Sequence, residues 1–152
     1  MELELVSFNQ AQSLKELGFP NILSYQACPY SYFGKYLIDI NNNDVSALNP
    51  KWREVKNEDI CFAPSLELVA KWLRKEKKLS ISVSWMPNIK KYNCICSDMN
   101  YTPKEHPSKE AYKMYKEQFE VRKNDNDLFD DYEEALSAGI NKAIEMLTNK
   151  EE

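Results

Sequence analysis

The chain has 152 residues, of which 43% are hydrophobic, and a formal net charge of −4 at pH 7. A chain of this length suits one domain that buries about 68–70% of its unfolded surface. The acidic balance disfavours a dedicated nucleic-acid binder, and a total of three glycines disfavours phosphate-cradling loops. No apolar run is long enough to span a bilayer and the acidic N-terminus lacks a signal-peptide pattern, so we expect a cytoplasmic protein without a membrane partner.

The first predicted element is a helix over residues 8–17. Ser7 and Gln10 have the spacing of a capping box, and Gly18 stands where helices commonly end in a left-handed residue. Pro20 then prevents the helix from continuing.

A tyrosine-rich region follows and favours β structure. Residues 22–40 predict one or two strands, of which the clearer covers 32–40, and residues 41–44 predict an Asn/Asp turn. Trp52 and Val55 fit either a short strand or a cover over the sheet edge.

The clearest pattern of the chain lies at residues 63–86, where a helix leads directly into a strand. Ser65 can cap the helix, and apolar side chains at helical spacing predict that it covers 65–77. From residue 79 the apolar period becomes that of a strand, which predicts a strand over 79–86 with one apolar face and one serine face. The solvent side of the helix carries cations that we name the basic stripe: Lys71, Arg74, Lys75 and Lys78.

The strand pattern returns at residues 91–98, so 79–86 and 91–98 predict a hairpin. Residues 99–107 contain two prolines and predict a loop. Residues 109–121 fit a helix, and a strand over 112–121 is the alternative.

The last predicted helix covers residues 131–148 and is capped by Asp130 or Asp131. Gly139 falls within its apolar face. A glycine inside a helix costs about 1 kcal/mol relative to alanine, so we expect the helix backbone to approach a sheet or another helix closely at this residue.

Four segments together resemble a known family: residues 14–19, 63–76, 79–83 and 132–140. The family consists of small, mostly uncharacterised proteins encoded by bacteriophages and prophages. Its order of elements is a short helix, a tyrosine-containing β region, an Ala-Pro…Trp-Leu-Arg-Glu helix, a β hairpin and a Tyr-Glu-Glu-Ala-Leu helix. The resemblance implies a phage or prophage origin and marks residues 99–124 as an insertion, and it implies no catalytic residues.

A metal site is the first chemical alternative. Cys94 and Cys96 would point to one face of a strand, where Cys28 or Cys61 could join them. Structural zinc normally requires two ligand pairs on turns, and the single histidine, His106, lies in a predicted loop. We therefore expect reduced, packed thiols and no metal.

Catalytic and calcium-binding patterns are equally incomplete. A Cys/His nucleophile would need His106 beside a thiol, with an acid such as Glu105 to orient it. Asp125, Asp127 and Asp130 only loosely follow calcium-loop spacing, because the required glycine and glutamate are missing. The sequence therefore predicts no catalytic residue and no cofactor.

These patterns predict an α+β fold in which the helices 65–77 and 131–148 pack mainly on one face of a small antiparallel sheet of three to five strands. The function that we expect is a non-enzymatic phage or prophage accessory protein, or protein-interaction module, in the host cytoplasm. Nucleic-acid binding through the basic stripe is an alternative that the net charge disfavours, and an unrecognised enzyme is another. An open sheet edge would also allow a homodimer.

Overall fold

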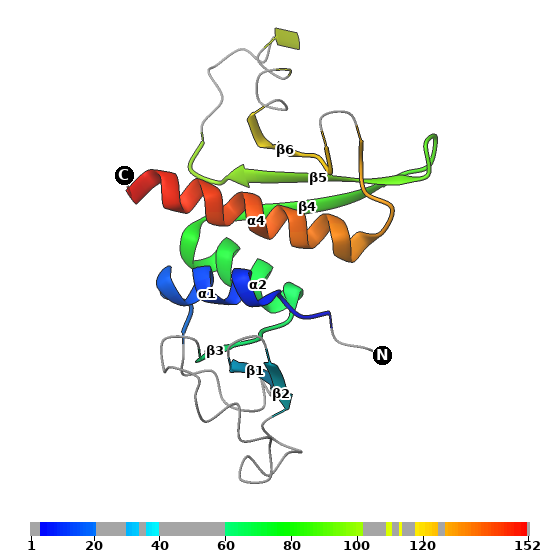
Figure 1. Ribbon diagram of the computed structural model, residues 1–152. Helices are drawn as coiled ribbons and strands as arrows, with labels where there is room; N and C mark the ends of the chain where they lie inside the picture. Colours follow the sequence, from blue (N-terminus) through cyan, green and yellow to red (C-terminus); the bar gives the residue numbers. More distant parts are fainter. Residues whose placement is uncertain are drawn as a thin grey trace. The chain divides into compact units, whose positions relative to one another are not determined.

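The chain divides into two compact units, Met1–Leu68 and Val69–Glu152, and the boundary falls within helix α2 (Leu66–Trp72). The single domain and the insertion at 99–124 stay predictions. The computed structural model (Figure 1) describes residues 4–20, 30–33, 36–39, 60–101, 109–110, 113, 118–124 and 127–151.

The first unit begins with helix α1 (Phe8–Glu16), which confirms the helix expected at 8–17. Both hydrogen bonds of the capping box are present: the Gln10 backbone N–H donates to Ser7 Oγ, and the Ser7 N–H donates to Gln10 Oε1. Gly18 has a φ of +85° and ends the helix as predicted.

The tyrosine-rich region contributes two strands, β1 (Tyr30–Phe33) and β2 (Tyr36–Asp39), instead of one long strand over 32–40. With β3 (Ile60–Phe62) they form an antiparallel sheet of order β2-β1-β3. The Tyr32 hydroxyl donates to the backbone oxygen of Val6 at 2.7 Å, which attaches β1 to the segment before α1. Trp52 and Val55 lie outside the described residues.

Helix α2 begins after Ser65, whose Oγ accepts a hydrogen bond from the Leu68 N–H at 3.2 Å. In the second unit the helix continues as a π-helical segment, η3 (Leu73–Lys77). Lys78 then adopts a left-handed backbone conformation with a φ of 57°, which ends the helix and starts strand β4. The predicted helix over 65–77 and its cap are therefore confirmed.

The predicted hairpin is confirmed with the same bounds, as β4 (Leu79–Met86) and β5 (Lys91–Asp98). Strand β6 (Glu120–Val121) pairs with β5 and gives an antiparallel sheet of order β4-β5-β6. The described residues of 109–119 are helical, and strand β6 follows them. The helix expected over 109–121 and the alternative strand over 112–121 are therefore each present in part.

Helix α4 (Tyr132–Glu151) packs against all three strands of this sheet and, in Figure 1, extends along the hairpin. The side chains on the α4 side are identified by their contacts, because Cys94 Sγ lies next to Gly139 and Cys96 Sγ lies 3.8 Å from Met146 Sδ. A Cβ on Gly139 would lie 2.5 Å from Ile81 Cγ2, which confirms the predicted close approach. The core residues of this unit include Leu73, Leu79, Cys94, Cys96, Phe119, Ala135, Leu136, Ile140 and Ala143.

The α+β class with small antiparallel sheets is thus as the sequence predicts. The six described strands form two three-stranded sheets rather than one, with one sheet in each unit. The reason is the local pairing of hairpins: β1 pairs with β2 and β4 pairs with β5, and each hairpin recruits one further short strand.

Candidate functional site

The basic stripe lies on α2 and η3, and all four of its side chains are exposed. Lys78 Nζ donates to the Lys75 backbone oxygen at 2.9 Å, so this ammonium group satisfies a terminal helix carbonyl. Among the described residues, Lys71, Arg74 and Lys75 have no ion-pair partner. The stripe is therefore a solvated cationic surface.

A second surface lies where the tip of the β4–β5 hairpin meets the start of α4, and the sequence did not single it out. We name it the tip patch, and it consists of the aromatic rings of Trp85, Tyr92 and Tyr132 together with Ile89, which lies in the turn between β4 and β5. Trp85 and Tyr92 are cross-strand partners with ring centroids 4.9 Å apart, and the Tyr132 ring stands edge-on to Tyr92 at 6.2 Å. The exposed fractions are 50% for Trp85, 53% for Ile89 and 36% for Tyr132.

The exposure of Trp85 corrects the strand prediction. The period of two residues places Trp85 on the apolar face with Leu79, Ile81 and Val83, and this face does lie on the α4 side. Leu79 is buried, but burial decreases along β4 toward the tip. The first residue of α4 is Tyr132, beside Tyr92, so the helix begins too late to cover the ring of Trp85.

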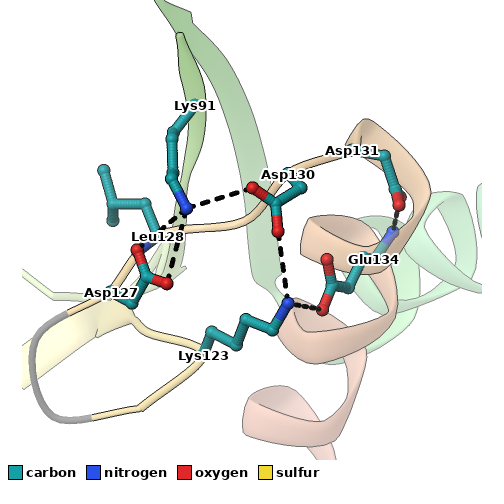
Figure 2. Close-up of polar contacts among 7 residues, drawn as sticks. All are labelled: Lys91, Lys123, Asp127, Leu128, Asp130, Asp131 and Glu134. Carbon is teal, nitrogen blue, oxygen red and sulfur yellow. Dashed lines mark hydrogen bonds and ion pairs between the residues drawn. The ribbon is translucent and has the colours of Figure 1, made fainter. Parts of the chain in front are cut away.

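Figure 2 shows an ion-pair network that includes Lys91, the chain neighbour of Tyr92 in the tip patch. Lys91 Nζ lies 3.1 Å from Asp127 Oδ1 and 3.0 Å from Asp130 Oδ1. Lys123 Nζ lies 3.4 Å from Asp130 Oδ2 and 2.9 Å from Glu134 Oε1. Asp130 therefore connects a lysine of β5 with a lysine of the segment after β6.

The backbone holds this network against the hairpin. The Tyr92 N–H donates to the Phe129 oxygen at 2.8 Å, and the Phe129 N–H donates back to Tyr92 at 3.1 Å. Phe129 is buried, and Asp131 Oδ1 accepts the Glu134 N–H at 2.6 Å as the cap of α4. The predicted cap is thus confirmed as Asp131, and the start of α4 is fixed beside the hairpin tip.

Three groups of the network, Asp130, Lys91 and Lys123, stay ionised at neutral pH. Hydrogen bonds from Lys91 and Lys123 hold the pKa of Asp130 below its ordinary value. The carboxylates of Asp130 and Asp127 raise the pKa of Lys91, and those of Glu134 and Asp130 raise the pKa of Lys123. These lysines are therefore unsuited to act as neutral nucleophiles or bases.

The thiols that suggested a metal site are buried under α4. Burial raises the pKa of Cys94 to about 12 and that of Cys96 to about 11, so both remain protonated at neutral pH. The residues that the structure describes contain no group of three or more His, Cys, Asp or Glu side chains that could hold a metal ion. Cys28, Glu105, His106 and Asp125 lie outside them.

A groove of about 670 Å³ lies beside α4 and is lined in part by Val121, Phe129 and Ala138. Its cationic side chains each have a carboxylate partner within the lining, as the pairs Glu120–Arg122, Lys123–Glu134 and Lys142–Glu145. The charged side chains of the lining therefore compensate one another.

No family model, curated protein or solved structure matches this chain. Over the part of the chain that the structure describes, no helix is both long and apolar enough to cross a membrane. Fold and site together describe an α+β protein whose described residues include an exposed aromatic cluster at a hairpin tip.

Proposed function

We propose that this chain is a non-enzymatic protein-interaction module, encoded by a phage or prophage and acting in the cytoplasm of the host. The observation that carries the proposal is the tip patch, in which Trp85, Ile89 and Tyr132 are exposed on a framework of paired strands and a capped helix. Clustered exposed apolar side chains with a polar rim are typical of protein-interaction sites.

The chemistry of the patch favours a protein partner. Tryptophan and tyrosine are enriched among the residues that contribute most to protein–protein binding, since they bury large areas with few rotatable bonds. The thiols of Cys94 and Cys96 remain protonated and the lysines of the ion-pair network remain charged, which supports a binding function rather than nucleophilic catalysis at these residues.

A photo-crosslinking amino acid at position 89 tests this proposal in a bacterial host that carries the phage or prophage. We expect the protein with the crosslinker in place of Ile89 to form a crosslink with one protein. The additional substitution Trp85→Ser should abolish this crosslink. A matched variant carries the crosslinker at Glu145, which is exposed on α4. Equal yields at both positions, or a catalytic turnover that a single point substitution abolishes, would contradict the proposal.

Nucleic-acid binding through the basic stripe is the second candidate, favoured by its exposed cations without described ion-pair partners. Four phosphate contacts would weaken binding roughly 100-fold between about 50 and 200 mM salt. Fluorescence anisotropy with duplex DNA and with single-stranded RNA measures this slope. Lys71→Glu/Arg74→Glu should abolish binding, whereas Trp85→Ser should not, and absence of binding at low salt ends this candidate.

A further inference from the structure

We propose that the tip patch binds the arginine or lysine side chains of a cationic segment in the partner protein. This inference rests on the proposed interaction function and adds the chemistry of the partner. It follows from two properties of the same surface, its exposed aromatic rings and the excess of carboxylates around it.

The rings provide the first property. Trp85, Tyr92 and Tyr132 form a continuous row with centroid separations of 4.9 and 6.2 Å. The faces of tryptophan and tyrosine rings carry negative electrostatic potential and attract ammonium and guanidinium groups. Lys77 Nζ already lies 5.4 Å from the centroid of the Trp72 ring, so this type of contact occurs within the protein itself.

The surrounding charges provide the second property. Residues 127–134 contain five carboxylates, whereas three lysines, Lys90, Lys91 and Lys123, lie in or beside the tip and its network. The network shares three carboxylates between two ammonium groups and is therefore anionic. Asp131 and Glu133 are exposed and are the chain neighbours of Tyr132, so they add negative charge to the start of α4.

This combination distinguishes among possible partners. A nucleic acid or an acidic segment would be repelled by the excess carboxylates, and a purely apolar segment would leave them without partners. A cationic segment places its charge near the carboxylates and over the rings. Arginine suits the row better than lysine, because its planar guanidinium both stacks on aromatic rings and pairs with carboxylates.

The test uses the full-length protein and two synthetic probes, acetylated tetra-arginine and acetylated tetra-citrulline. Citrulline has nearly the shape of arginine but no charge. In an NMR titration, we expect the indole N–H of Trp85 to shift with tetra-arginine, and the affinity to be at least about tenfold higher than for tetra-citrulline.

Two variants locate the binding. Trp85→Ser and Asp131→Asn/Glu133→Gln should each weaken tetra-arginine binding at least about fivefold. Asparagine also caps helices, so the second variant keeps the start of α4. Lys71→Glu/Arg74→Glu is the control away from the tip patch, and we expect it to leave the affinity unchanged.

Equal affinity for the two probes, or binding that Trp85→Ser does not change, would overturn the inference. If the crosslink from position 89 were still observed in that case, the proposed interaction function would remain supported, but the partner segment would not be cationic. The protein could instead form a salt-sensitive dimer that Lys71→Glu/Arg74→Glu abolishes. The tip patch would then bind the basic stripe of a second copy instead of a segment of another protein, and this result would also overturn the inference.

Discussion

Gly139 shows how one residue determines the packing of α4. An added Cβ would lie 2.5 Å from Ile81 Cγ2 and 2.8 Å from Cys94 Sγ, closer than such atoms approach in proteins. Gly139→Ala should therefore destabilise the protein by about 1–3 kcal/mol through overpacking, even though alanine favours a helix by about 1 kcal/mol. Urea unfolding measures the difference.

Ile81→Ala supplies the control for this contact. It removes Cγ2, so Gly139→Ala should cost less in the Ile81→Ala protein than in the wild type. A Gly139→Ala protein as stable as the wild type would contradict the close approach of α4 to the sheet.

Asp98 and Lys150 form the shortest ion pair among the described residues, with an Oδ2–Nζ distance of 2.7 Å. Hydrogen bonds from the Lys150 ammonium and the Asn100 backbone N–H lower the pKa of Asp98. Because the folded pKa lies below the unfolded value of about 3.9, the pair stabilises the fold above about pH 4 and loses this contribution as the pH falls through the lowered pKa.

The melting temperatures at about pH 6 and about pH 3 test this dependence. The decrease on acidification should be smaller in Asp98→Asn and in Lys150→Ala than in the wild type, since each variant lacks the pair. An equal decrease in all three proteins would show that Asp98 does not contribute.

The connectors that precede β4 and β5 end in lysines with positive φ, 57° at Lys78 and 51° at Lys90. Left-handed conformations cost a residue with a Cβ about 1–2 kcal/mol, and glycine adopts them without this strain but loses more chain entropy on folding. We expect Lys78→Gly and Lys90→Gly each to raise the free energy of unfolding by about 0.5–1 kcal/mol.

Denaturant unfolding measures both variants, with Lys75→Gly as the comparison. Lys75 lies within η3, where glycine should instead destabilise by about 1 kcal/mol. Destabilisation by all three substitutions would mean that the strain at Lys78 and Lys90 is negligible.

Local sequence signals predicted several elements well. The helix 8–17 and the hairpin 79–86/91–98 agree with α1, β4 and β5 because caps and apolar periods act over a few residues. The helical period placed Gly139 on the buried face of its helix, and the period of two residues assigned the strand faces correctly. Each of these predictions depends only on the period of its own element.

The tip patch and the network depend on distant residues, so the sequence did not show them. Lys91 and Asp130 are far apart in the chain and meet because Phe129 pairs with Tyr92. The period of β4 assigns Trp85 to a face but does not state how far a covering helix extends. The basic stripe was predictable as an exposed surface, because it follows from helical period alone.

At the scale of the whole molecule, thiol labelling reports how tightly α4 holds the sheet. With pKa values of about 12 and 11, the thiolate fractions of Cys94 and Cys96 at about pH 8 are about 10⁻⁴ and 10⁻³. In a Cys28→Ser/Cys61→Ala background, native labelling should be at least about 1,000-fold slower than labelling of the unfolded chain.

Native labelling should accelerate in Gly139→Ala, because the strained helix separates from the sheet more often. Fast labelling of the native background protein would contradict the burial of both thiols. The Lys71→Glu/Arg74→Glu variant should label at the rate of the background protein, since its changes lie on an exposed surface.

The close contact at Gly139 also fixes the position of α4 along its own axis. A shift of α4 by one turn, about 5.4 Å, would bring the methyl group of Ala135 or Ala143 to the place that only a bare backbone fits. The same shift would separate Tyr132 from Tyr92 at one end of the helix and Lys150 from Asp98 at the other. A residue without a side chain thus decides, from the middle of the helix, where the aromatic row is assembled.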